Sequence, residues 1–101
     1  MKNISYPLAS DWTTEEIITV TAFYRQIENA YELAQGVSVA DLLTAYAAFK
    51  KIVTSKSQEK QLDKQFEQAT GYSWYHALKE ARATNKKSLK MVPRGRYNER
   101  S

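Results

Sequence analysis

Four segments of this chain begin with a polar N-cap residue and continue with apolar residues spaced three or four positions apart. The N-cap residues are Thr13, Ser38, Ser55 and Ser73. An N-cap followed by an apolar stripe of this period predicts an amphipathic helix. The predicted helices cover residues 14–34, 39–53, 56–69 and 74–84. With three glycines and two prolines in 101 residues, the chain favours long helices over many turns. We therefore expect an all-α fold, a compact bundle of four helices.

The segment before the first helix has a different character. Residues 1–12 lack helical periodicity, and Pro7 restricts the residue before it to extended conformations. We expect an extended N-terminal arm that covers part of the core with Tyr6, Leu8 and Trp12. The arm and the four helices would together form a single domain over residues 1–84.

Two glycines mark expected helix ends. Glycine adopts the left-handed conformation of a C′ position at little cost, so Gly36 and Gly71 are expected to end the first and third helices. The connection between the first two helices is only a few residues long, which predicts that they pack antiparallel. The side chain of Ser73 is expected to cap the fourth helix.

Basic residues concentrate at the end of the chain. Residues 85–101 hold six basic residues and one acidic residue, whereas residues 1–84 hold nine basic and ten acidic residues. We expect a flexible basic tail, and its candidate anion contacts are Lys86, Lys87, Lys90, Arg94 and Arg96. Two alternatives stay open. The basic residues could serve solubility alone, or a final turn could dock on the domain through Leu89, Met91 and Val92.

Aromatic residues are numerous, with seven Tyr, three Phe and two Trp. Three of them cluster around the Gly71 turn: Tyr72, Trp74 and Tyr75. Aromatic side chains are enriched in interface hot spots, but they are also large core residues. Two interpretations therefore remain, a packed core or a partner surface formed by this cluster. Tyr72 and Tyr75 are the best candidates for exposed positions.

The residue types that catalysis and metal binding require are scarce. The chain has no cysteine, a single histidine (His76) and no glycine-rich phosphate loop. We therefore expect no metal site, no cofactor, no catalytic residues and no enzymatic activity. Glu28 and Glu32 share a helix face, and they are expected to be solvated. The third helix is also expected to expose its two charged stripes, Lys56, Lys60 and Lys64 beside Glu59, Asp63 and Glu67.

Several blocks of the sequence match a known family. The blocks are Tyr6-Pro7, Asp11-Trp12, Thr14-Glu15-Glu16-Ile17-Ile18, Glu28, Ala30-Tyr31-Glu32, Gly36-Val37, Tyr46, Phe49-Lys50, Ile52-Val53, Ser55-Lys56, Phe66-Glu67, Gly71-Tyr72-Ser73 and Tyr75. Through them the chain resembles the uncharacterised protein family 0223, small helical proteins of Gram-positive Firmicutes that include the YktA-like proteins. The resemblance implies an all-helical fold and a cytosolic bacterial protein. It implies no activity and supplies no site residues.

The favoured functional hypothesis is a small cytoplasmic protein-interaction module without catalytic activity. The alternative is a nucleic-acid-associated accessory protein that uses the basic tail, because lysine and arginine bind phosphates by charge. The sequence starts without the apolar region of a secretory signal, and no stretch reaches the ~20 apolar residues of a membrane span. The first helix is apolar around much of its circumference, so both a monomer and a homodimer are compatible with the sequence.

Overall fold

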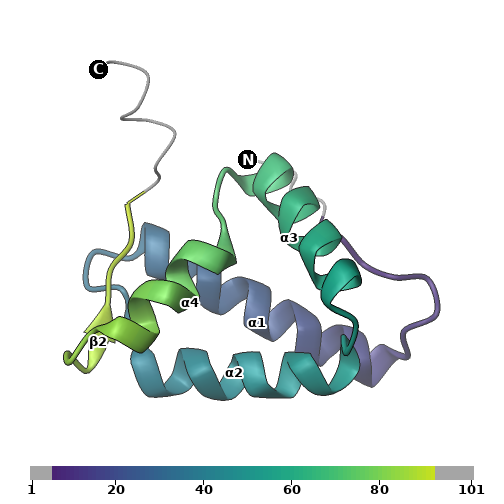
Figure 1. The fold of residues 1–101 in the computed structure, drawn as a ribbon, viewed down its shortest axis with the longest axis horizontal. Coiled ribbons are helices and arrows are strands. Elements are labelled where there is room, and N and C mark those ends of the chain that lie inside the picture. Colours follow the sequence, from purple (N-terminus) through teal and green to yellow (C-terminus); the bar gives the residue numbers. More distant parts are fainter. Residues whose placement is uncertain (1–5, 93–101) are drawn as a thin grey trace.

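Four helices account for most of the computed structural model, which describes residues 6–92 (Figure 1). The helices are α1 (Thr14–Glu32), α2 (Val39–Ile52), α3 (Lys56–Thr70) and α4 (Trp74–Ala83). Two short strands, β1 (Val37–Ser38) and β2 (Ser88–Leu89), pair antiparallel. The prediction of an all-α bundle of four helices is confirmed, and the small sheet is an addition that the sequence did not predict.

The helices are arranged around an antiparallel pair. Helices α1 and α2 lie side by side and run in opposite directions, as their short connection predicted (Figure 1). Helix α4 packs against both of them, while α3 leans away from α4 beyond the turn that joins the two. None of the helices within residues 6–92 has the length and apolar character that crossing a membrane requires.

Three of the four helix starts use the local caps that the sequence predicted. Thr13 and Glu16 form a reciprocal capping box, with N···O distances of 3.1 and 2.9 Å. The hydroxyls of Ser38 and Ser55 each accept a hydrogen bond from the backbone N–H three residues later. Such caps satisfy N–H groups that have no partner within the helix.

The core is an aromatic cluster centred on Trp74. The Trp74 side chain is 1 % exposed. Four aromatic rings from the other three helices have centroids 5.3–5.5 Å from the Trp74 ring centroid. They belong to Phe23, Tyr24, Phe49 and Phe66. Aromatic pairs at these distances add attraction to the gain from apolar burial. The aromatic residues therefore serve the core to a large extent, which was one of the two interpretations.

The described part of the N-terminal arm packs on this cluster mainly through Tyr6 and Pro7. The Tyr6 ring lies 5.2 Å from Tyr24, whose hydroxyl donates to the Pro7 carbonyl oxygen at 2.8 Å. Trp12 is partly buried against the core. The expectation for Leu8 is wrong, because its side chain is 46 % exposed. The residue before it, Pro7, is buried instead.

Residues 85–92 belong to the folded domain, whereas the sequence placed the end of the domain at residue 84. Strand β2 pairs Leu89 with Val37, and Leu89 and Met91 are buried in the core. The Met91 N–H donates to the Ala30 carbonyl oxygen at 2.7 Å. The alternative that a final turn docks through Leu89, Met91 and Val92 is thus correct for Leu89 and Met91, although they dock as a short strand and the residues after it. It is wrong for Val92, which is 47 % exposed. Residues 93–101, the remainder of the expected flexible tail, lie outside the described part.

Gly36 has a different role from the helix end that was expected. Helix α1 ends at Glu32 with Leu33 as its C-cap, so Gly36 lies beyond it. Gly36 has φ +72°, and a Cβ atom there would lie 1.9 Å from the Leu89 carbonyl oxygen. The close passage of β2 therefore requires a glycine. Gly71, by contrast, is the left-handed C-cap of α3 and has open space around it, as expected of a helix end.

Candidate functional site

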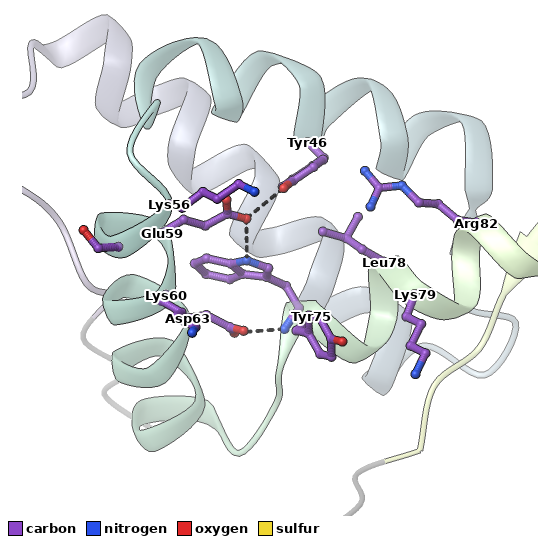
Figure 2. Close-up of a pocket in the computed structure, with 11 residues that line it drawn as sticks. Tyr46, Lys56, Glu59, Lys60, Asp63, Tyr75, Leu78, Lys79 and Arg82 are labelled. Carbon is purple, nitrogen blue, oxygen red and sulfur yellow. Dashed lines mark hydrogen bonds between the residues drawn. The ribbon is translucent and has the colours of Figure 1, made fainter.

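A groove of about 730 Å³ opens between α3 and α4, with α2 at one end (Figure 2). The divergence of α3 and α4 creates it, and most of its lining is apolar. The aromatic and aliphatic part of the lining consists of Tyr46, Trp74, Tyr75 and Leu78. The groove has the size and apolar character typical of ligand sites.

The aromatic cluster that the sequence singled out is divided among three environments. Tyr75 stands on the wall of the groove and is 61 % exposed. Trp74 forms part of the floor, but it is buried, so its assignment to a partner surface is wrong. As the first residue of α4 it points inward, and its indole fills the centre of the core. Its exposed neighbour is therefore the only member of the cluster that a partner meets freely at the groove.

Tyr72 lies away from the groove, at the end of α1. Its ring stacks on Tyr31 with centroids 4.5 Å apart, and its hydroxyl donates to Glu32 Oε2 at 2.8 Å. The side chain is half-buried. Tyr72 thus fixes the turn after α3 onto α1, and the structure does not bring it together with Tyr75.

Glu59 holds the polar side of the groove floor together. It accepts hydrogen bonds from Tyr46 at 2.8 Å and from the Trp74 indole at 3.4 Å (Figure 2). It also accepts one from Lys50 Nζ at 2.6 Å. Burial by itself would raise the pKa of Glu59, but the bonds from Lys50, Tyr46 and Trp74 outweigh burial and hold the pKa below its ordinary value. Burial and the same carboxylate raise the pKa of Tyr46 to about 12.

Asp63 caps α4 from the neighbouring helix. Its Oδ1 accepts from the Trp74 backbone N–H at 3.1 Å, and its Oδ2 accepts from the Ser73 hydroxyl at 3.4 Å. The expectation that Ser73 caps α4 with its own side chain is wrong, because this hydroxyl makes no cap bond. Burial raises the pKa of Asp63, against the opposing effect of the N–H groups of Trp74 and Tyr75.

These two carboxylates correct the expectation that α3 exposes both charged stripes. Within residues 6–92, no ion pair joins one stripe to the other, and the ion pair of Glu59 is with Lys50 of α2. A signal in the sequence could have indicated this. Glu59 lies three positions before the buried Leu62, and Asp63 lies three positions before the buried Phe66, which places each carboxylate next to the buried face of α3.

Four cations surround the groove. Lys56 and Lys60 come from α3, and Lys79 and Arg82 come from α4 (Figure 2). The Arg82 guanidinium lies 5.4 Å from the centre of the Tyr46 ring, which is within the range of a cation–π contact. The groove therefore combines an apolar floor with a basic rim.

The predicted anion contacts at the C-terminus lie elsewhere. Lys86 and Lys87 are exposed and do not line the groove. Lys90 is exposed, but two of the three N–H donors of its Nζ are engaged, by the carbonyl oxygens of Tyr31 at 2.7 Å and Leu33 at 2.9 Å. Its positive charge lies at the negative end of the α1 dipole and stabilises it, and α1 has no basic residue of its own in its last turn. Arg94 and Arg96 lie outside the described residues.

The remaining candidates are structural. The expectation that Glu28 and Glu32 are solvated holds for Glu32, which is exposed and accepts a hydrogen bond from Tyr72. Glu28 departs from it, because its side chain is half-buried and accepts a hydrogen bond from the Tyr6 hydroxyl at 2.6 Å. Burial and Glu28 raise the pKa of Tyr6 to about 12. His76 is half-buried beside the Tyr75 ring. Over residues 6–92, His, Asp and Glu do not gather in groups of three or more that could hold a metal ion.

The fold and the groove define a small all-α domain with a C-terminal strand that returns to the end of its first helix. The chain belongs to the uncharacterised protein family UPF0223, whose sequence pattern matches residues 3–90. The family resemblance seen in the sequence is thereby confirmed, and the match extends to Lys90.

Relatives in this family come from Firmicutes. A UPF0223 protein of Streptococcus sanguinis (strain SK36) is 47 % identical over 90 residues, which are 89 % of this chain and 96 % of the relative. One from Streptococcus equi subsp. zooepidemicus (strain MGCS10565) is 54 % identical over 81 residues, 80 % of this chain and 86 % of the relative. The Oceanobacillus iheyensis protein OB1419 is 49 % identical over 86 residues, 85 % and 96 % of the two chains. These names state no activity.

Proposed function

We propose that this protein is a non-catalytic protein-interaction module of the cytoplasm, and that the groove between α3 and α4 is its binding site. The observation that supports this proposal is the exposed Tyr75 on the wall of an open, mostly apolar groove. Tyrosine, tryptophan and arginine are the residues most enriched in binding hot spots. An apolar centre with a charged rim is also the usual anatomy of a protein interface.

The polar groups of the groove favour binding over catalysis. A general acid or base must reach the substrate with a proton-accepting or proton-donating atom. The oxygens of Glu59 and Asp63 already accept hydrogen bonds from the protein itself. Glu59 holds Tyr46 and Trp74 in the groove floor, and Asp63 caps the N-terminus of α4. The proposal needs no chemical step from either residue.

A matched pair of variants tests the proposal. Tyr75 and Ile18 are 61 % and 62 % exposed, but only Tyr75 lines the groove. A photo-crosslinking amino acid placed at position 75 in living cells should form a discrete adduct with a partner protein, while the same group at position 18 should not. The partner should also be lost from affinity capture with Tyr75→Ala and retained with Ile18→Ala. Adducts at position 18 alone, or at neither position, would contradict the proposal.

Among the candidate anion contacts within residues 6–92, Lys90 is engaged with carbonyl oxygens at the end of α1, whereas Lys86 and Lys87 are exposed and keep the nucleic-acid alternative open to test. The structure also changes how it should be tested. Deleting residues 85–101 would remove the buried Leu89 and Met91 and damage the fold. Deleting only residues 93–101 keeps both, so a band-shift assay with that shorter deletion separates binding from folding.

A further inference from the structure

The charges of the groove are arranged in two rows of one sign. Lys56 and Lys60 are four residues apart on α3, and Lys79 and Arg82 are three residues apart on α4. Residues at these spacings are neighbours on one helix face. Each wall of the groove therefore carries a pair of cations one helical turn apart, with the apolar floor between the two walls.

The acidic residues of the lining leave these cations without carboxylate partners. Glu59 forms its ion pair with Lys50, which lies outside the lining, and Asp63 accepts hydrogen bonds at the start of α4. Within residues 6–92, none of the four rim cations has a carboxylate oxygen within 4.0 Å. The rim thus presents positive charge that no direct ion pair offsets.

The groove floor between the two rows of cations is apolar and favours an apolar occupant. Leu78 and Trp74 are buried beneath it, Tyr46 is half-buried and lies against Arg82, and Tyr75 offers the exposed ring. A nucleic acid strand gains from successive exposed rings on which its bases stack, and this floor exposes one. An amphipathic helix lays its apolar face into a groove and keeps its charges at the flanks, which matches the floor and the two rows.

We propose that the groove binds an acidic amphipathic segment of a partner protein, with an apolar anchor against Tyr75 and Leu78 and carboxylates facing the cations of α3 and α4. This inference rests on the proposed function. It adds the chemistry of the partner, which is an apolar stripe flanked by Asp and Glu one helical turn apart.

A library of short random peptides displayed on phage tests the proposal even while the partner is unidentified. The full-length protein serves as bait, and Tyr75→Ala serves for counter-selection. Selected sequences should carry Asp or Glu on both sides of apolar residues at helical spacing. Groove-dependent peptides that are neutral or basic would overturn the acidic chemistry and leave the interaction module intact. No groove-dependent peptide at all would overturn both, and selection of single-stranded DNA from a parallel random pool would assign the groove to nucleic acid.

Charge reversal then locates the contact. For a selected peptide, the double variant K60E/K79E should weaken binding by roughly tenfold or more and reduce its salt dependence, because rim charges act through long-range attraction. The control K86E/K87E reverses two exposed lysines outside the groove and should change binding less than about twofold. The indole N–H signal of Trp74 should shift on binding while that of Trp12 stays in place. Equal effects of the two double variants would contradict the proposed site.

Discussion

Two helix ends within the described residues are capped by charged side chains from distant positions in the chain. One of these side chains is acidic and the other is basic. Asp63, 11 residues before Trp74, accepts from the N-terminus of α4. Lys90 donates to the C-terminus of α1, 57 and 59 residues away. Both charges have the sign that the helix dipole favours. The comparison shows that an ionisable residue that looks like a surface charge in the sequence can stabilise the fold. The groove-rim cations, which have no ion pair, are therefore better indicators of a binding site.

The two ends differ in how much of the fold depends on them. The Lys90 end belongs to a clasp formed by β1, β2 and the residues through Met91, which also places Leu89 and Met91 in the core. The Asp63 end fixes one wall of the groove. Disrupting the clasp should therefore cost stability, whereas disrupting the Asp63 cap should affect both stability and the groove.

The largest expected effect comes from Gly36→Ala, which attacks the clasp directly. The new Cβ would lie 1.9 Å from the Leu89 carbonyl oxygen, so β2 has to move and Leu89 and Met91 lose their burial. We expect a loss of about 2–4 kcal/mol in the free energy of unfolding, the scale of lost core burial. Gly71→Ala is the control, since only the left-handed backbone is strained there, and it should cost about 1 kcal/mol. Urea unfolding measures both, and equal losses would show that β2 does not hold Gly36 closely.

Asp63→Ala should have the next largest effect. It leaves the first N–H groups of α4 without their acceptor, and removal of a helix N-cap costs about 1–2 kcal/mol. Ser73→Ala is the informative partner, because Ser73 is the N-cap by position but makes no cap bond with its side chain. A larger loss for Ser73→Ala than for Asp63→Ala would assign the cap to the serine after all. Urea unfolding of the two variants decides between them.

Lys90→Met keeps the length of the side chain and removes its charge from the end of α1. We expect a loss of about 0.5–1 kcal/mol, because the freed carbonyl oxygens of Tyr31 and Leu33 can bind water. The effect should add to that of Asp63→Ala in the double variant, since distant sites act independently. A loss as large as that of Gly36→Ala would mean that the lysine, and not the strand, holds the clasp.

The smallest effect is a pair of opposite pH dependences on one helix. The pKa of Glu59 lies below its ordinary value of 4.5, so its contribution to stability is present above that value and is lost as the pH falls through the folded-state pKa. The pKa of Asp63 lies above its ordinary value of 3.8, so between 3.8 and the folded-state pKa the folded form binds more protons, and stability falls as the pH rises. Carboxyl carbon NMR shifts measured against pH should separate the two titrations. A pKa for Glu59 above that of Asp63 would contradict the assignment.

The sequence predicted those features that depend on neighbours in the chain. The capping residues Thr13, Ser38 and Ser55 act over three residues, so their hydrogen bonds follow from local spacing. The antiparallel α1 and α2 follow from a short connection. Phe23, Phe49 and Phe66 belong to the apolar stripes of their helices and are buried, because helical spacing alone brings such residues to one face.

Part of the candidate site was visible in the sequence. Tyr75 was named as an exposed candidate and lies on the groove wall. Of the two residues grouped with it, Trp74 is buried in the groove floor and Tyr72 packs on α1. Residues that are adjacent along the chain diverge at a helix start, where each successive side chain turns by about 100°. Of the rim cations, Lys56 and Lys60 were expected on a solvated stripe, and Lys79 and Arg82 were not singled out, because their common groove exists only after α3 and α4 are placed.

The sequence by itself determined the four helices, most of their caps and the aromatic residues that fill the core. The tertiary structure decided which charged residues serve the fold and which remain free. Glu59, Asp63 and Lys90 look like surface charges in the sequence, but each meets its partner only when distant segments pack together. Local caps and helical stripes act within a few residues, whereas these contacts depend on positions in space that no short window of sequence contains.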